Sequence, residues 1–392
     1  MISQSAIALC YCRQLCPLLK MLIHPPSYTS LSELASHSAG GKVLFATDDF
    51  FATCENMIAD EEPIFIADKY TEYGKWMDGW ETRRKRIPGH DWCIIKLATK
   101  CVIKGLVIDT AFFTGNNAPK FSIQAATLTS EDEKLIPVRH PTMGSSCSAQ
   151  DMELITRIHS DEWQEIVPVT VLRPGYEDTR FNYQKVVNDD SWTHIRVNIY
   201  PDGGIARLRV FGEAKPELLA IHDMIDLVSL LNGGICQGFS NAHYGHPRNI
   251  LKPMKSRSMA DGWETARRAD RPEIIEENDD GTLRFSGNEW AVYKLGFAGT
   301  IRRVCIDTTH FKGNYPDHIR IEGCNLGQND WDNQSNNECN WRSILVPCKL
   351  SAHKEHWFSC QSDLITHVRV TIAPDGGLSR LRLLGYVDQT TL

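Results

Sequence analysis

Apolar and polar residues alternate along several short segments of the chain, with the period of two that is typical of half-buried β-strands. The alternation is clearest over 195–199 and 368–372, where valine and isoleucine alternate with polar residues. Pro-Asp-Gly-Gly follows both runs and favours a turn, because proline presets φ and glycine allows positive φ. A second alternating run follows each turn, over 206–210 and 379–383. We therefore predict a strand–turn–strand unit at the end of each half of the chain.

Segments 102–108 and 301–306 are rich in β-branched residues and also predict strands. Many short strands separated by turn signals favour an antiparallel sandwich over an α/β fold. Apolar residues show helical spacing over 216–231, between the two halves, and this segment is interpreted as a helical linker. The predicted fold class is all-β, with two tandem sandwich domains.

The two halves of the chain are diverged copies of one unit. Three pairs of similar segments keep the same order in each half: 78–82 with 261–265, 108–116 with 306–314, and 193–212 with 366–385. Such ordered self-similarity indicates an internal duplication.

The duplication sets the expected domain boundaries. We predict a disordered N-terminal segment (1–24), a first repeat (25–213), the helical linker (214–232) and a second repeat (233–387).

The composition is that of an ordinary soluble globular protein, with 42% hydrophobic and 23% charged residues. A net charge of −7 shows no basic excess, so we expect no nucleic-acid partner. No apolar run is long enough to span a membrane. The 13 cysteines form no Cys-x-x-Cys pair and several lie inside apolar runs, which predicts buried free thiols in a reducing compartment, and hence a cytoplasmic protein.

Residues that could carry chemistry gather at the two copies of the sequence DGWET: Trp80, Glu81, Arg83, Arg84 and Arg86 in the first copy, and Trp263, Glu264, Arg267 and Arg268 in the second. A guanidinium group binds a carboxylate through two parallel hydrogen bonds. A neighbouring glutamate could orient a ureido group or transfer a proton to a leaving amine. The alternative is an internal Glu–Arg salt bridge that caps a loop. The tryptophans form either a wall of the site or a plug of the core.

A second cluster follows the strands predicted at 102–108 and 301–306: Asp109 and Asn116 in the first half, and Asp307, His310 and Asn314 in the second. A strand that runs into a Gly-Asn turn places polar side chains at a sheet rim, where sandwich folds carry binding loops. Asp and Asn also stabilise turns through their own backbone, which is the structural alternative. His310 has no counterpart in the first half and is either a general acid or base, or a loop histidine without a role.

The repeated segments resemble those of the allantoicase family, over about residues 35–386: MDGWETRR at 77–84, IDTAFFTGNNAP at 108–119 and YPDGGIARLRVFG at 200–212, with ADGWETARR at 260–268, IDTTHFKGNYP at 306–316 and APDGGLSRLRLLGY at 373–386. The resemblance implies two jelly-roll β-sandwiches, similar to galactose-binding-like domains, in a homo-oligomer. It also implies a hydrolase that cleaves a non-peptide C–N bond of a linear amidine, converting allantoate to ureidoglycolate and urea in purine (allantoin) degradation.

Under this hypothesis the arginines after DGWET hold the carboxylate of an anionic ureide, and Glu81 or Glu264 assists proton transfer as urea leaves. No zinc, P-loop or dinucleotide-binding motif occurs, so we expect no cofactor. A metal could take the place of the acid, but the sequence shows no ligand set for one.

The second half departs from the first after its DGWET sequence. Trp263 and Trp290 lie 27 positions apart, against 12 for Trp80 and Trp92, and the extra stretch, 273–281, is acidic and polar. If this loop borders the site, its negative charge weakens turnover of an anion. Two alternatives therefore stand beside an active allantoicase: an inactive homologue that keeps the fold, and a non-catalytic ligand-binding β-sandwich protein.

Overall fold

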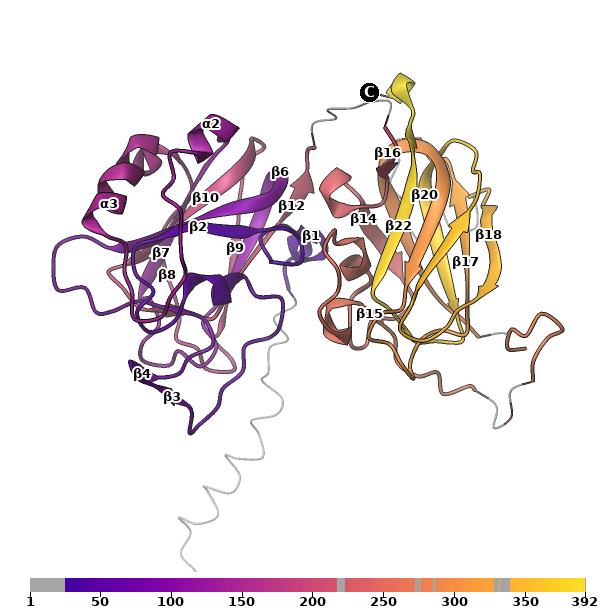
Figure 1. Cartoon of the computed structure of the whole chain (residues 1–392), viewed down its shortest axis with the longest axis horizontal. Coiled ribbons are helices and arrows are strands. Elements are labelled where there is room, and N and C mark those ends of the chain that lie inside the picture. The colour runs from indigo at the N-terminus through magenta and orange to yellow at the C-terminus, as the bar shows by residue number, and fades with distance from the viewer. Residues whose placement is uncertain are drawn as a thin grey trace, which may run out of the picture.

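The computed structural model describes residues 25–216, 223–271, 274, 276–284, 287–327, 331 and 339–391. Two β-sandwich domains follow one another along the chain (Figure 1). The N-terminal segment 1–24 lies outside the described residues.

The first domain is built from twelve strands: β1 (Ser32–Glu33), β2 (Lys42–Ala46), β3 (Tyr70–Thr71), β4 (Gly74–Lys75), β5 (Trp80–Glu81), β6 (Asp91–Asp109), β7 (Lys120–Ala126), β8 (Gln164–Val171), β9 (Phe181–Lys185), β10 (Ser191–Tyr200), β11 (Gly204–Ile205) and β12 (Arg207–Ala214). Two short helices, α2 (Ser130–Glu133) and α3 (Ala149–Ile155), lie between β7 and β8.

Strand β6 belongs to both layers of this sandwich. Its first half pairs with β2 and β10, and β10 continues that layer to β7 and β8. Its second half pairs with β9 and β12, and β12 continues the other layer to β1. The pairing register of β6 with β10 shifts between Trp192 and His194, where the strand passes from one layer to the other. Apolar side chains of the two layers fill the space between them.

The second domain repeats this arrangement with β13 (Ile225–Asp226), β14 (Ile235–Phe239), β15 (Trp263–Glu264), β16 (Glu289–Asp307), β17 (His318–Cys324), β18 (Arg342–Lys349), β19 (Glu355–Ser359), β20 (Ile365–Ala373), β21 (Gly377–Leu378) and β22 (Arg380–Val387). Its sheet order, β13-β22-β16-β20-β17-β18, matches β1-β12-β6-β10-β7-β8 of the first domain. The predicted all-β fold with two tandem sandwiches is therefore confirmed.

The strands predicted on either side of each Pro-Asp-Gly-Gly turn are present, as β10 and β12 and as β20 and β22. They do not pair with each other as a hairpin would. Both β10 and β12 pair with β6, one in each layer, so the turn carries the chain across the edge of the sandwich.

The predicted helical linker needs correction where the structure describes it. Residues 217–222 lie outside the described residues, but β13 at 225–226 pairs with β22, and Leu230–Asn232 form a single 3₁₀ turn. Val228, which contributed to the helical spacing, is fully buried in the core, as is its neighbour Leu227. Packing against the second sheet has overridden the local pattern of this segment.

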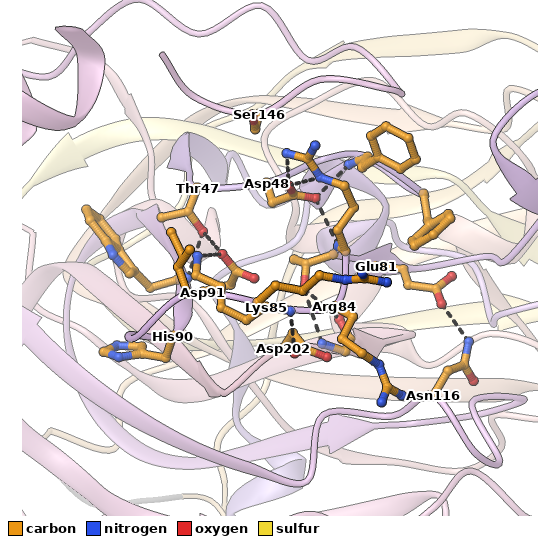
Figure 2. A pocket seen from close by; sticks show the side chains of 18 of the residues that line it. Thr47, Asp48, Glu81, Arg84, Lys85, His90, Asp91, Asn116, Ser146 and Asp202 are labelled. Atoms are coloured by element: carbon orange, nitrogen blue, oxygen red, sulfur yellow. Dashed lines mark hydrogen bonds and ion pairs between the residues drawn. The ribbon is translucent and has the colours of Figure 1, made fainter. Parts of the chain in front are cut away.

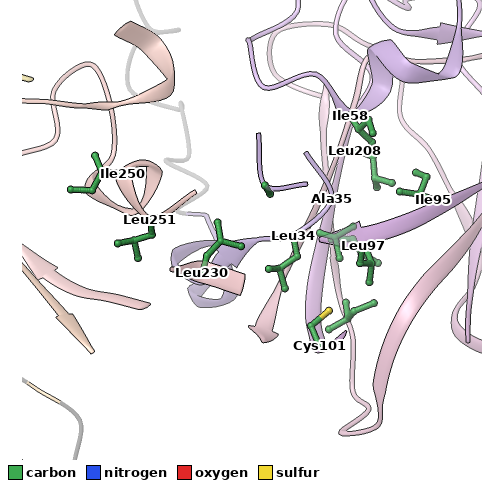
Figure 3. Packing of buried hydrophobic residues seen from close by; sticks show 14 of the residues in the cluster. Leu34, Ala35, Ile58, Ile95, Leu97, Cys101, Leu208, Leu230, Ile250 and Leu251 are labelled. Atoms are coloured by element: carbon green, nitrogen blue, oxygen red, sulfur yellow. The ribbon is translucent and has the colours of Figure 1, made fainter. Parts of the chain in front are cut away.

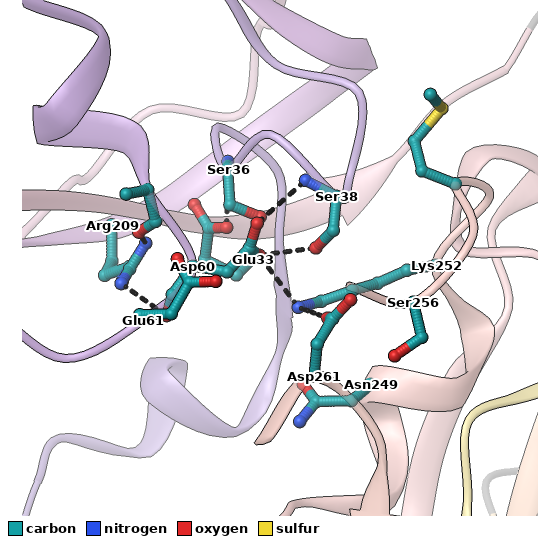
Figure 4. Close-up of polar contacts among 12 residues, drawn as sticks. Glu33, Ser36, Ser38, Asp60, Glu61, Arg209, Asn249, Lys252, Ser256 and Asp261 are labelled. Carbon is teal, nitrogen blue, oxygen red and sulfur yellow. Dashed lines mark hydrogen bonds and ion pairs between the residues drawn. The ribbon is translucent and has the colours of Figure 1, made fainter. Parts of the chain in front are cut away.

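The two domains share one hydrophobic core cluster. Leu34 of the first domain lies near Leu230, and Leu251 of the 3₁₀ helix η7 (Pro247–Leu251) extends the cluster into the second domain (Figure 3). A buried ion pair lies beside it, where Lys252 Nζ contacts Asp60 Oδ1 at 3.0 Å and Asp261 Oδ1 at 2.9 Å (Figure 4). Apolar contact and a buried charge network thus join the domains.

The ten cysteines that the structure describes are all unpaired, and five of them are buried, which confirms the predicted free thiols for this part of the chain. Across the same residues, no helix has both the length and the apolar character needed to cross a membrane.

Candidate functional site

The three repeated motifs of the first half meet at Glu81. Strand β11 pairs with β5, which sets Gly204 opposite Glu81. The Gly204 N–H donates to the carbonyl oxygen of Asn116 at 2.8 Å, and the Asn116 side chain donates to Glu81 Oε1 at 2.7 Å. Segments near 80, 116 and 204, predicted separately as motifs, therefore build one site.

A pocket of about 940 Å³ opens beside Glu81 (Figure 2). Its charged lining residues are Asp48, Glu81, Arg83, Arg84, Lys85, Arg86, Asp91 and Asp202. Ser146, Cys147 and Met152 line it from the long segment between β7 and β8. All of its lining residues belong to the first repeat, so the pocket does not lie between the two domains.

The arginines after DGWET divide into two kinds. Arg83 Nε contacts Asp48 Oδ2 at 2.8 Å, so this arginine is in an internal salt bridge, but with an aspartate outside the motif and not with the glutamate considered from the sequence. Arg84 and Arg86 are exposed, line the pocket and make no hydrogen bond or ion pair with any described residue. Their guanidinium groups are available to an anion.

Lys85 and Asp91 form a buried polar wall of the same pocket. Lys85 Nζ contacts Asp91 Oδ1 at 2.6 Å, and the Thr47 hydroxyl donates to the same oxygen at 2.8 Å. Near them, His90 Nε2 lies 3.0 Å from Asn198 Oδ1, and burial lowers the pKa of this histidine. His90 is therefore neutral near pH 7 and is not a positive group of the site.

Glu81 is a buried carboxyl group of the pocket whose pKa is raised. Burial raises the pKa of its carboxyl to about 7, and the hydrogen bond from Asn116 opposes that shift only in part. A carboxyl group with a pKa near the working pH both gives and takes protons readily. This property suits Glu81 for proton transfer.

The second repeat keeps the glutamate–asparagine pair, since Asn314 Nδ2 donates to Glu264 Oε1. Its cationic positions differ from those of the first repeat. Ala266 and Ala269 stand where the first repeat has Arg83 and Arg86, and Asn241 stands where it has Asp48.

The two arginines that remain in the second repeat are unlike each other. Arg268 is held by Asp270 at 2.8 Å and by Glu289 at 2.9 Å, whereas Arg267 is exposed and unpaired within the described part of the chain. The second repeat thus has fewer positive groups free to hold an anion.

His310 belongs to a turn of the second domain. Its backbone has a φ of 73°, its N–H donates to His353 Nδ1 at 2.8 Å, and its Nε2 lies 2.9 Å from the carbonyl oxygen of Ser256. These contacts hold the turn, a structural role that neither sequence alternative for His310, a general acid or base or a loop histidine without a role, had included.

Four other residues predicted to bind substrate are buried and make contacts inside the fold. Trp80 and Trp263 are fully buried, so they are plugs of the core and not walls of the site. Asp109 is buried against Arg180, with a contact of 2.9 Å between Oδ1 and Nε, and Asp307 accepts the N–H of Thr309 at 2.8 Å. The structure gives all four the structural role that the sequence had left open.

The described residues of the acidic stretch in the second repeat do not line the pocket of the first. Within its described residues, Glu276 pairs with Arg284 at 3.0 Å and Glu277 lies 3.9 Å from Lys349. None of these residues lines the pocket beside Glu81. The acidic loop was expected to weaken turnover only if it bordered the site, and its described residues do not border this pocket.

Sequence reasoning missed Asp48, Asp91 and Asp202 as residues of the site. Asp202 lies inside a repeated motif, so its position carried a signal, whereas Asp48 carried none because its contact with Arg83 joins distant segments. In the part of the chain that the structure describes, no three His, Cys, Asp or Glu side chains gather as they would around a metal ion.

Comparison with known proteins places the chain in a class of duplicated-repeat proteins. A family model described as "Allantoicase repeat" matches residues 32–215 and again 225–388. The chain is 40% identical to the "Probable allantoicase 1" of Burkholderia mallei, over 91% of this chain and 94% of that protein. It is 37% identical to a "Probable allantoicase" of Acinetobacter baumannii, over 94% of this chain and 99% of that protein.

The fold agrees with this class. The crystal structure of allantoicase from Saccharomyces cerevisiae matches with a TM-score of 0.68 at 32% identity, covering 91% of this chain and 93% of that one. The chain belongs to the allantoicase family.

Proposed function

We propose that the protein hydrolyses allantoate to ureidoglycolate and urea, and that the pocket of the first repeat is the active site. The observation that carries the proposal is that two guanidinium groups, without a partner among the described residues, and a buried glutamate line one pocket. Allantoate has one carboxylate and two ureido arms on the same carbon, so it offers an anion to the arginines and a leaving nitrogen to the glutamate.

The reaction requires a proton at the nitrogen that leaves and a hydroxyl group at the carbon that remains. Arg84 and Arg86 bind the substrate carboxylate. Protonated Glu81 donates its proton to the urea nitrogen as the C–N bond breaks. Water then adds its oxygen to the carbon and returns a proton to Glu81, so one water is consumed and the glutamate is regenerated. Asn116 holds the Glu81 carboxyl in place throughout.

Urea release from purified protein supplied with allantoate tests the activity, and a matched pair of variants tests the site. Loss of a charge-assisted pair costs about 2 to 3 kcal/mol, so Arg84→Ala should lower kcat/KM by roughly 30- to 150-fold. Arg267→Ala removes the equivalent arginine of the second repeat and should stay within about threefold of the native protein.

The two outcomes that contradict the proposal differ. Native protein that releases no urea would show that the activity is wrong. Equal losses in both variants would show that the first repeat alone does not hold the site.

We further infer that the protein is cytoplasmic, associates with itself and binds no nucleic acid. The unpaired cysteines support a reducing compartment, and the net charge of −7 argues against a polyanionic partner. Self-association is implied by the family resemblance. Light scattering of purified protein measures it, and a mass of one chain at every concentration would contradict it.

A further inference from the structure

We propose that Asp202 accepts the N–H groups of one ureido arm and so selects for substrates that carry this group. The inference rests on the proposed function, since it assigns a role within the same pocket. Asp202 is half-buried and lines the pocket, and its Oδ2 accepts the backbone N–H of Lys85 at 2.8 Å. Its Oδ1 has no hydrogen-bond or ion-pair partner among the described residues.

In the second repeat, the aspartate equivalent to Asp202 is paired with a cation. Asp375 occupies the equivalent turn, and its Oδ2 accepts the backbone N–H of Arg268 at 2.8 Å, just as Asp202 accepts that of Lys85. Its Oδ1, however, is paired with Arg271 Nη2 at 2.7 Å. Counted along the chain from the DGWET sequence, the first repeat has the uncharged Pro88 where the second repeat has Arg271. Within the described residues, the first repeat therefore leaves without a partner an aspartate oxygen that the second repeat pairs with an arginine.

The position of Asp202 connects it to the two groups assigned to the reaction. Asp202 lies two residues before Gly204, which pairs with Glu81 across β11 and β5. The backbone N–H that holds it belongs to Lys85, the neighbour of Arg84. All three side chains line one pocket, and Figure 2 shows them together there. A substrate bound to Arg84 and reaching Glu81 is thus within the same enclosure as the open oxygen.

Ureido chemistry fits an open carboxylate oxygen. The N–H and the terminal NH₂ of a ureido group present parallel hydrogens on the side opposite their carbonyl oxygen, and a carboxylate accepts such a pair. A carboxylate at this place also repels the carboxylate of the substrate. Asp202 therefore fixes which end of the molecule faces the arginines, and favours a ureido arm over an arm without the terminal NH₂.

Two small ligands separate this role from a general effect on the fold. N-carbamoylglycine has a carboxylate and one ureido arm, and N-acetylglycine has a methyl group in place of the terminal NH₂. Calorimetric titration of the full-length native protein should show tighter binding of N-carbamoylglycine, by about tenfold or more, because a hydrogen bond to a charged group contributes roughly 1.5 kcal/mol or more. Asp202→Asn should bring the ratio of the two dissociation constants to within about threefold. The NH₂ group of the asparagine side chain is itself a donor, so it cannot accept a hydrogen bond from the ureido N–H groups of the ligand.

Asn at this position still accepts the Lys85 N–H through its carbonyl oxygen, so the turn is kept. Asp375→Asn is the matched control and should leave the ratio unchanged. Pro88→Arg places a cation at the same number of residues after DGWET as Arg271, close in sequence to Lys85, and it should lower the ratio without removing the carboxylate. This second variant keeps the test decisive if Asp202→Asn fails to fold.

A ratio that stays at the native value in both Asp202→Asn and Pro88→Arg would overturn the inference, as would native protein that binds neither ligand. The titrations need no turnover. Native protein that shows the ureido preference but releases no urea from allantoate would therefore contradict the proposed function and leave the role of Asp202 intact.

Discussion

At the scale of single residues, the site depends on how the surroundings of each side chain set its pKa and whether its charge is paired. Burial raises the pKa of Glu81 to about 7, while Arg84 and Arg86 remain at the pocket surface with their charges unpaired among the described residues. The buried acid and the exposed cations lie within a few residues of one another because β5 ends at Glu81 and the chain then leaves the sheet. A short sequence thus supplies both the proton donor and the anion-binding groups.

Glu81→Gln should lower kcat by about 100-fold or more, because a positioned acid contributes 10²- to 10⁴-fold. It should also stabilise the fold in alkaline solution. Folded Glu81 keeps its proton up to about pH 7, whereas an ordinary glutamate loses it near 4.5, so the stability of the native protein falls as pH rises through this window. Melting temperatures on either side of the window, with urea release at each pH, measure both effects.

The control for this variant is Glu264→Gln, which should keep most of the activity. A melting temperature of Glu81→Gln that is lower than that of the native protein at alkaline pH would show that the charge of Glu81 is not destabilising. A kcat within about threefold of the native value would remove Glu81 from the proton transfer.

At the scale of elements, the short pairing of β11 with β5 aligns the site. It requires glycine at position 204, because a Cβ there would lie 2.0 Å from the ring of Phe113. The second repeat has the same constraint, since a Cβ at Gly377 would lie 1.9 Å from the ring of Phe311. In each repeat, therefore, a phenylalanine ring leaves no room for a side chain at this glycine, but only the first repeat holds the proposed active site.

Gly204→Ala and Gly377→Ala should each destabilise the protein by about 1 to 3 kcal/mol, the usual cost of overpacking, as measured by unfolding in guanidinium chloride. Only Gly204→Ala should also reduce kcat, because the displaced strand carries Glu81 with it. If the two variants lose activity to the same degree at equal stability, the alignment of β11 with β5 is not what positions the acid.

At the scale of the whole molecule, Lys252 joins the domains through carboxylates of both. Burial alone would raise the pKa of Asp60, but the charge of Lys252 and hydrogen bonds from Ser38 outweigh it, so the pKa lies below its ordinary value. Ionised Asp60 therefore stabilises the fold above its ordinary pKa, and this contribution is lost as pH falls through the lowered value. Asp261, the other partner of Lys252, begins the DGWET sequence of the second repeat.

Lys252→Met should lower the free energy of unfolding by about 3 kcal/mol near neutral pH, because it leaves a buried carboxylate without its cation. The dependence of stability on acid should become shallower, since the pKa of Asp60 returns toward its ordinary value. Lys255→Met is the control: its side chain is 92% exposed and lies 3.7 Å from Glu355, so its loss should cost about 1 kcal/mol or less. Equal losses in both variants would contradict a structural role for the buried pair.

The sequence by itself determined the architecture and the family. Alternating residues, turn glycines and ordered repeats act through neighbours in the chain, so β10, β12 and their copies in the second half could be predicted without coordinates. The glutamate–asparagine pair of each repeat was also within reach, since both residues lie in repeated motifs. The helix predicted between the halves was wrong over its described part, because contact with β22 outweighed a local pattern.

The tertiary structure alone decided which residues are free to act. Arg83 and Arg84 are adjacent and alike in sequence, yet Asp48 neutralises only Arg83. Asp202 and Asp375 occupy identical motifs, yet among the described residues Asp375 pairs with an arginine and Asp202 does not. Trp80 and Asp109 were predicted to be residues of the site, whereas both are buried inside the first domain. Charge and burial depend on partners that are distant along the chain, and only folding brings those partners together.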